Sequence, residues 1–238
     1  MTGKMLLPLV GGSPAVWNTC LMFFQGVLLL GYGYVHFMRR RGPHMLVLLF
    51  PLLVLPIDVS ERAIATIPTQ TSPVPWLLGF LALTAGLPVF IFSTTAPLLQ
   101  RWFAETEHQD ARDPYFLYAA SNAGSLVGLL SYPAFVEPHF TLAEQSYFIA
   151  IGYGLLVLLV AFCSHRLRPS FKTPPITIPA PWSQRLRWII LAFVPSSLML
   201  GVTTYITTDV APFPMLWVLP LALYLITFIL TFGRRPVP

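Results

Sequence analysis

The side chains that could do chemistry are few, and the polar ones lie inside long apolar stretches. The uncharged polar residues near the middle of these stretches are Gln25, Thr84, Asn122, Ser125, Ser196, Ser197, Thr203 and Thr204. In lipid such groups either line a ligand cavity or form a hydrogen bond. The bond runs to another helix or to a carbonyl one turn earlier in the same helix, and each contributes about 0.6 kcal/mol. The positions that we single out for ligand or interhelical polar contacts are Gln25, Asn122, Ser125, Ser197 and Thr204. Gln25 stands out because its amide must satisfy four hydrogen-bonding positions among apolar neighbours.

Ionisable residues are missing from the middles of the same stretches. Glu144, Asp209 and His36 lie only near their ends. A carboxylate at the membrane midplane, which would couple transport to a proton or sodium gradient, therefore has no candidate. Cys20 and Cys163 stand alone, without a second Cys or His at ligand spacing. We expect no catalytic, cofactor-binding or metal-binding residue and no enzyme activity in this chain.

The composition explains why the polar residues sit in apolar surroundings. Hydrophobic residues make up 55% of the 238 residues and charged residues 10%, against about 25% charged in soluble domains. The apolar stretches recur near the bilayer-spanning length of about 20 residues. The net charge of +5 comes from basic clusters at their ends, which is typical of membrane topology and argues against nucleic acid as a partner. The sequence predicts an all-α, polytopic helical membrane bundle.

Seven apolar segments are predicted to span the bilayer. They are Pro14 to Met38, His44 to Ile57, Pro75 to Leu98, Pro114 to Val136, Leu142 to Cys163, Trp188 to Thr208, and Pro214 to Phe232. The second is only about 21 Å long at 1.5 Å per residue, and it contains Pro51 and Pro56. It must therefore thin the bilayer, extend through Val59 to Ile67, or dip in without a clean crossing.

The basic residues predict the orientation. Lys4 and Arg62 fall in one set of alternate loops, and the remaining 12 of the 14 Lys and Arg residues fall in the other set. Those 12 are Arg39, Arg40, Arg41, Arg101, Arg112, Arg166, Arg168, Lys172, Arg185, Arg187, Arg234 and Arg235. Because basic loops stay in the cytoplasm, the N-terminus is expected outside and the C-terminus inside a bacterial inner (plasma) membrane. The alternation holds only if all seven segments cross.

A proline-rich stretch divides the chain. We expect a five-span bundle over 1–163, a basic cytoplasmic connector over 164–187, and two further spans with a cytoplasmic tail over 188–238. The connector reads as semi-rigid, either as a hinge between two bundles or as a passive link near anionic lipid. Gly124 and Gly128 form a small-xxx-small pair that predicts close helix packing.

Four longer motifs go beyond composition. They are GKMLLPLVGGSPAVWNTCLMFFQ from Gly3, APLLQRWFA from Ala96, DPYFLYAASNAGSLVGLLSYPAFVEP from Asp113, and TTDVAPFPMLWVLPLALYLITFILTF from Thr207. In this order and spacing the chain resembles the membrane region of bacterial fused major-facilitator/spermidine-synthase-like proteins. The resemblance implies a bundle that is major-facilitator-like in part and is joined, in longer members, to a cytoplasmic synthase-like domain. That domain has no matching positions here, and neither does the helix that longer members place before the GKM motif.

Two functions follow as expectations. The first is a membrane scaffold or anchor that supports a cytoplasmic domain or partner subunit, with lipid, a second copy or another protein as its partners. The second is a transporter-like unit that binds a small molecule between helices. The scarcity of polar groups at mid-membrane favours the scaffold.

The topology can be tested by single-cysteine labelling in a background that lacks Cys20 and Cys163. Lys4→Cys and Glu137→Cys should react with an impermeant maleimide in intact cells, whereas Lys172→Cys and Arg235→Cys should react only after permeabilisation, because the basic loops are held inside. Labelling at position 172 from outside would contradict the orientation.

Overall fold

The computed structural model describes residues 14–38, 41–57, 72–167, 180–206 and 218–233. All regular elements in these ranges are helices. Four are long and apolar enough to cross a membrane: Asn18–Phe37, Val74–Ala104, Leu142–Arg166 and Trp182–Tyr205. Gly42–Leu53 and Val218–Phe232 are shorter apolar helices. The all-α membrane class is confirmed, while the count of seven spans stays a prediction.

Two compact units make up the chain. The first consists of Met1–Arg112 and His139–Pro169, and the second of Asp113–Pro138 and Ser170–Pro238. The fourth apolar segment thus groups with the last two instead of with the first five, because helix α7 (Phe116–Ser131) packs along α11 (Val218–Phe232). The connector expected over 164–187 is helical at both ends, since α9 continues to Arg166 and α10 begins at Trp182.

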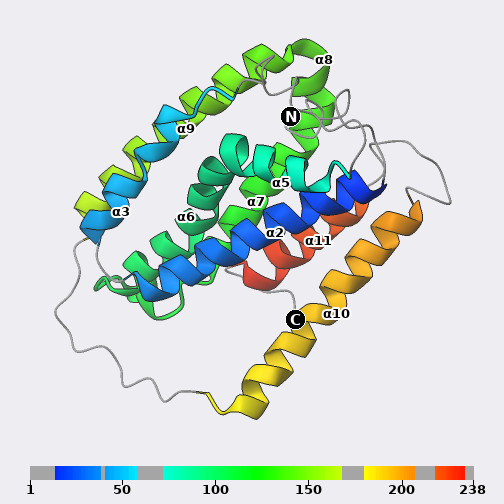
Figure 1. Ribbon diagram of the computed structural model, residues 1–238. Helices are drawn as coiled ribbons and strands as arrows, with labels where there is room; N and C mark the ends of the chain where they lie inside the picture. Colours follow the sequence, from blue (N-terminus) through cyan, green and yellow to red (C-terminus); the bar gives the residue numbers. More distant parts are fainter. Residues whose placement is uncertain (1–13, 39–40, 58–71, 168–179, 207–217, 234–238) are drawn as a thin grey trace. The chain divides into compact units, whose positions relative to one another are not determined.

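In the first unit, α2 (Pro14–Phe37) lies beside α5 (Val74–Leu81) and α6 (Leu87–Ala104), as Figure 1 shows. Val16 near the start of α2 shares a buried cluster with Leu77 of α5. Val35 near its end shares another with Leu98 of α6. The helices therefore run in the same direction, and the chain between them must return.

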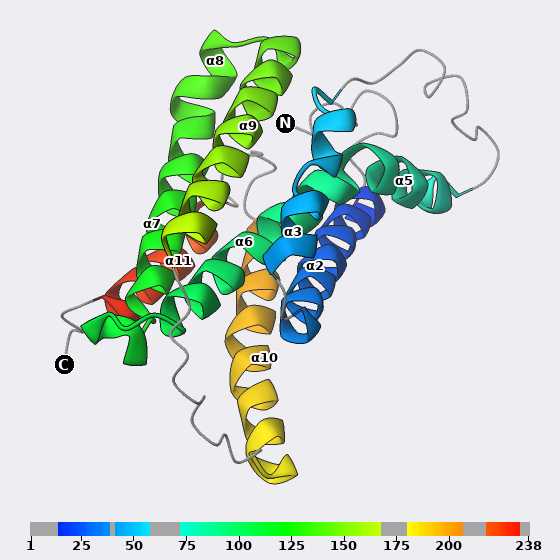
Figure 2. The same ribbon diagram turned by 90° about the vertical axis from the view of Figure 1, so that its left-hand side faces the viewer.

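Helices α5 and α6 join into one helix of 31 residues. A π-helical turn, η2 (Ala82–Gly86), separates them, and the helix changes direction there (Figure 2). Pro88 follows directly and removes a backbone donor, which is a common cause of such a bend. At about 46 Å the joined helix exceeds the roughly 30 Å hydrocarbon core. It continues past the predicted end at Leu98, so Arg101 and Trp102 belong to the helix and not to a loop.

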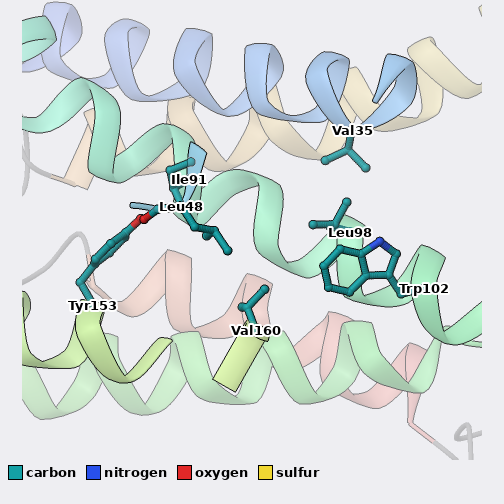
Figure 3. Packing of buried hydrophobic residues seen from close by; sticks show 7 residues of the cluster. All are labelled: Val35, Leu48, Ile91, Leu98, Trp102, Tyr153 and Val160. Atoms are coloured by element: carbon teal, nitrogen blue, oxygen red, sulfur yellow. The ribbon is translucent and has the colours of Figure 1, made fainter. Parts of the chain in front are cut away.

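The returning segment is short and broken. It consists of α3 (Arg41–Val47) and the 3₁₀ turn η1 (Phe50–Leu53), and the described part of this segment ends at Ile57. His44 packs near Trp102 at the end of α6, whereas Leu48 lies in the same cluster as Ile91, three turns earlier (Figure 3). The segment therefore runs antiparallel to α6.

Helix α9 (Leu142–Arg166) completes this unit. Its first turn is closed by a capping box, in which Thr141 Oγ1 accepts from the Glu144 N–H and the Glu144 carboxylate accepts from the Thr141 N–H. A buried stripe of Ser146, Tyr153 and Val160, at intervals of seven residues, faces the core. Seven-residue spacing keeps side chains on one helix face, so α9 presents one continuous edge to its neighbours.

In the second unit, α7 continues through the π turn η4 (Tyr132–Val136) into α8 (Glu137–His139). Rings at the start of α7 meet the end of α11: Tyr118 lies 5.7 Å from Phe232, centroid to centroid. The two helices, green and red in Figure 1, are therefore antiparallel. Helix α10 (Trp182–Tyr205) buries none of its side chains.

Gly31 is the glycine of α2 at which another helix comes close. A Cβ placed on Gly31 would lie 2.9 Å from Ser93 Cβ and 3.3 Å from the carbonyl oxygen of Phe90, and would also overlap Ser93 Oγ. A Cβ on Gly33, two residues later, would meet no described atom within 4 Å. Only the first glycine is needed for α2 and α6 to approach.

Gly31→Ala should destabilise the protein by about 1–3 kcal/mol, because the added methyl group must push α6 away. Gly33→Ala on the same helix is the matched control and should be neutral or slightly stabilising, since Ala favours a helix over Gly by about 1 kcal/mol. The measurement is thermal unfolding of the purified protein in detergent. Equal melting temperatures for the two variants would show that α2 and α6 are not in contact at Gly31.

Candidate functional site

The irregular backbone of residues 48–57 is held by side chains of α9. The Tyr153 hydroxyl donates to the carbonyl of Leu48 at 2.7 Å, and Ser146 Oγ donates to the carbonyl of Ile57 at 2.6 Å. Both contacts are buried. In lipid a carbonyl without a partner costs several kcal/mol, so a broken segment persists only where neighbouring side chains satisfy it. Interrupted helices of this kind line the binding sites of many transporters.

A buried histidine lies in α3, just before this irregular backbone. His44 is fully buried, its Nδ1 lies 3.3 Å from the Tyr34 hydroxyl, and its ring meets Trp102 edge to face at 6.3 Å between centroids. Its Nε2 has no hydrogen-bond partner among the described residues. An imidazole nitrogen can donate, accept or bind a metal, but no cluster of three His, Cys, Asp or Glu side chains occurs in the described part of the chain.

The polar residues predicted to form a site are divided between the two units. Gln25 is exposed in the first unit, and the other four belong to the second, where Ser197 is half-buried and Thr204 exposed. Asn122 Nδ2 donates to the Tyr118 carbonyl at 2.8 Å, and Ser125 Oγ to the Ser121 carbonyl at 3.1 Å. These bonds stay within α7. The interhelical contact expected for Asn122 and Ser125 is replaced by the intrahelical alternative, because a carbonyl one turn earlier is always within reach.

The glycine pair of α7 does not meet another helix. Gly124 and Gly128 are exposed, and a Cβ on either would find no described atom within 4 Å. Close packing through these two glycines therefore stays a prediction, with no partner helix among the described residues. Ala119 carries the buried contact on the opposite side of the helix.

Sequence reasoning missed the residues that do connect elements. Ser146, Tyr153 and His44 were overlooked because each is a single polar residue among apolar ones. A usable signal existed for two of them, since Ser146, Tyr153 and Val160 recur every seven residues. A heptad stripe that places hydroxyl groups on a helix face beside a proline-containing segment indicates carbonyls that need donors.

Comparisons of the chain with family models, with curated proteins and with solved structures found no match in any of the three. The resemblance to the spermidine-synthase-like membrane proteins thus rests on the four sequence motifs.

Tyr153→Phe removes one hydroxyl and leaves the Leu48 carbonyl without its donor. We expect a loss of about 1 kcal/mol in the free energy of unfolding, within the range measured for interhelical hydrogen bonds in membranes. Tyr147→Phe, at an exposed position of the same helix, is the control and should change nothing. Chemical unfolding in mixed micelles gives the two values, and an equal effect would mean that the Tyr153 bond does not stabilise the fold.

Proposed function

We propose that this chain is an integral membrane module with seven crossings that anchors a cytoplasmic domain or partner subunit at a bacterial inner membrane. Its N-terminus lies outside and its C-terminus in the cytoplasm. The scaffold function is supported above all by α10, an apolar helix of 24 residues with no buried side chain in the described structure. A transporter needs its helices closed around a cavity, whereas an anchor can leave helices to lipid or to another protein.

The directions of the helices support the crossings. Within the first unit, α2 and α6 are parallel, and 42–57 returns between them. Ser146 and Tyr153 meet Ile57 and Leu48 in reverse order, so α9 is antiparallel to that segment and parallel to α6. Within the second unit, α7 and α11 are antiparallel. These relative directions are those that the alternation of basic loops requires.

Partner surfaces of the right kind are present in the second unit. Helix α10 exposes consecutive apolar side chains from Ile189 to Leu191, which lie on different sides of the helix. The small-residue face of α7 around Gly124 is open among the described residues. Small faces let backbones approach closely, and this is how membrane helices associate without a hydrophobic driving force. A second copy or a membrane-embedded partner subunit would fit these faces.

A transporter-like unit remains the alternative, and the broken segment favours it. Residues 42–57 combine an interrupted helix with His44 Nε2, which has no hydrogen-bond partner among the described residues, and interrupted helices form the substrate sites of several transporter folds. The ligand would be neutral or anionic. A polyamine needs carboxylates to replace its hydration in a low-dielectric passage, at several kcal/mol for each charge, and the middles of the apolar segments contain none.

Three measurements separate these functions. The purified chain should show no change in melting temperature with spermidine at moderate salt, and proteoliposomes should take up none. A photoreactive residue at Phe193 of α10, which is largely exposed, should form a discrete protein adduct in native membranes.

A ligand present at a hundredfold excess over its dissociation constant would stabilise the protein by about 2.7 kcal/mol. Saturable spermidine uptake, or a stabilisation that Gln25→Ala or Asn122→Ala abolishes, would overturn the scaffold. Adducts with lipid alone at Phe193 would also count against it. Leu158, equally exposed on α9, is the control position for the cross-link.

A further inference from the structure

A cavity of about 420 Å³ opens where α2 and α6 end side by side. It is lined by Tyr32, Val35 and His36 from the last turns of α2 and by Arg101 from the last turn of α6. Arg101 is permanently charged, His36 is exposed, and no carboxylate is among the lining residues. The cavity is largely open to its surroundings, and the basic side chains in its lining suit an anion.

Two sets of contacts hold the guanidinium of Arg101 at the cavity. Nη1 donates to the carbonyls of Val35 at 2.9 Å and Met38 at 3.2 Å, and Nε lies 3.6 Å from a Glu105 carboxylate oxygen. The carbonyls are those at the end of α2, where a cation is favoured by the helix dipole. Nη2 makes no contact with the described residues, and a third of the side chain is exposed. The group is oriented in advance with a donor still available.

Apolar surface continues from this cavity along α2. Leu28 and Leu29, one turn before Tyr32, are exposed, and so is Phe37 at the helix end. An anion that carries an acyl chain would therefore find a charged pocket for its head and an apolar strip for its tail. Free phosphate would gain nothing from the strip. Free phosphate and a phospholipid headgroup both present phosphate oxygens, and arginine binds phosphate in strong, directional hydrogen bonds.

We propose that Arg101 and His36 bind the phosphate of an anionic phospholipid, whose acyl chain lies along Leu28 and Leu29 of α2. The ends of membrane helices are where headgroups lie, and basic pockets between such helices bind lipid headgroups in other membrane proteins. This site is independent of the scaffold function, because it needs only the contact between α2 and α6. The extension of α6 past Leu98 places Arg101 in this site.

The test is native mass spectrometry of the full chain in maltoside, with phosphatidylglycerol and phosphatidylcholine offered at equal concentration. The wild type should retain one phosphatidylglycerol in preference to phosphatidylcholine by about tenfold, because the choline cation of phosphatidylcholine offsets the charge of the phosphate and is repelled by Arg101. Arg101→Gln should abolish the preference. Arg101→Lys, which keeps the charge and loses the planar fork, should reduce it severalfold.

His36→Gln guards against a folding defect, because it leaves the Arg101 contacts with α2 intact and should still lower the preference. Arg185→Gln is the matched control: this arginine also donates to a carbonyl, that of Ala180, but lies at the start of α10. An equal preference in the wild type and Arg101→Gln, or an equal loss in Arg185→Gln, would overturn the proposal. Displacement of the lipid by millimolar inorganic phosphate would overturn it too, and would identify free phosphate as the ligand.

Discussion

The hydrogen bonds from α9 to the backbone of residues 48–57 are the interaction on which the first unit depends. A bilayer offers no water to a carbonyl that has left a helix, so each such group must find a donor inside the protein. Pro51 and Pro56 remove two backbone donors from this segment. Tyr153 and Ser146 donate to the carbonyls of Leu48 and Ile57, near the two ends of the irregular segment, at 2.7 and 2.6 Å. They lie seven residues apart, about 10.5 Å along one helix face, which lets a single helix hold both ends of the break.

Once the break is held, the remaining contacts of the unit follow. The return of the chain along α6 places Leu48 beside Ile91 and His44 beside Trp102. Helices α2 and α6 can then run in parallel, with Gly31 admitting the side chain of Ser93. Parallel neighbours bring two helix ends together at one level, and Arg101 lies there against the carbonyls of α2. A long-range contact at one end of the unit thus depends on local backbone chemistry at the other.

The sequence predicted the apolar helices well and their partners poorly. Segment Pro14 to Met38 agrees with α2 to within one residue, because length and hydropathy are local properties. Arg101 was expected in a loop, since nothing nearby in sequence shows that its guanidinium reaches a helix end 66 residues earlier. Likewise Gly31 and Gly124 look alike as sequence, and only the position of α6 makes the first of them a contact. The hydrophobicity of a sequence does not show which face of a membrane helix packs against protein, because the lipid-facing side is apolar as well.

The polar residues of α10 explain how a helix can remain unburied in a membrane. Ser196 Oγ donates to the Ala192 carbonyl at 2.9 Å, and Thr203 Oγ1 to the Met199 carbonyl at 2.7 Å. Hydroxyls that are satisfied one turn earlier carry no unmet donor into lipid, so they do not require a neighbouring helix. Lipid tails solvate the leucines of such a helix as well as another protein would. The hydroxyls of Ser196 and Thr203 therefore do not by themselves require a neighbouring helix for α10.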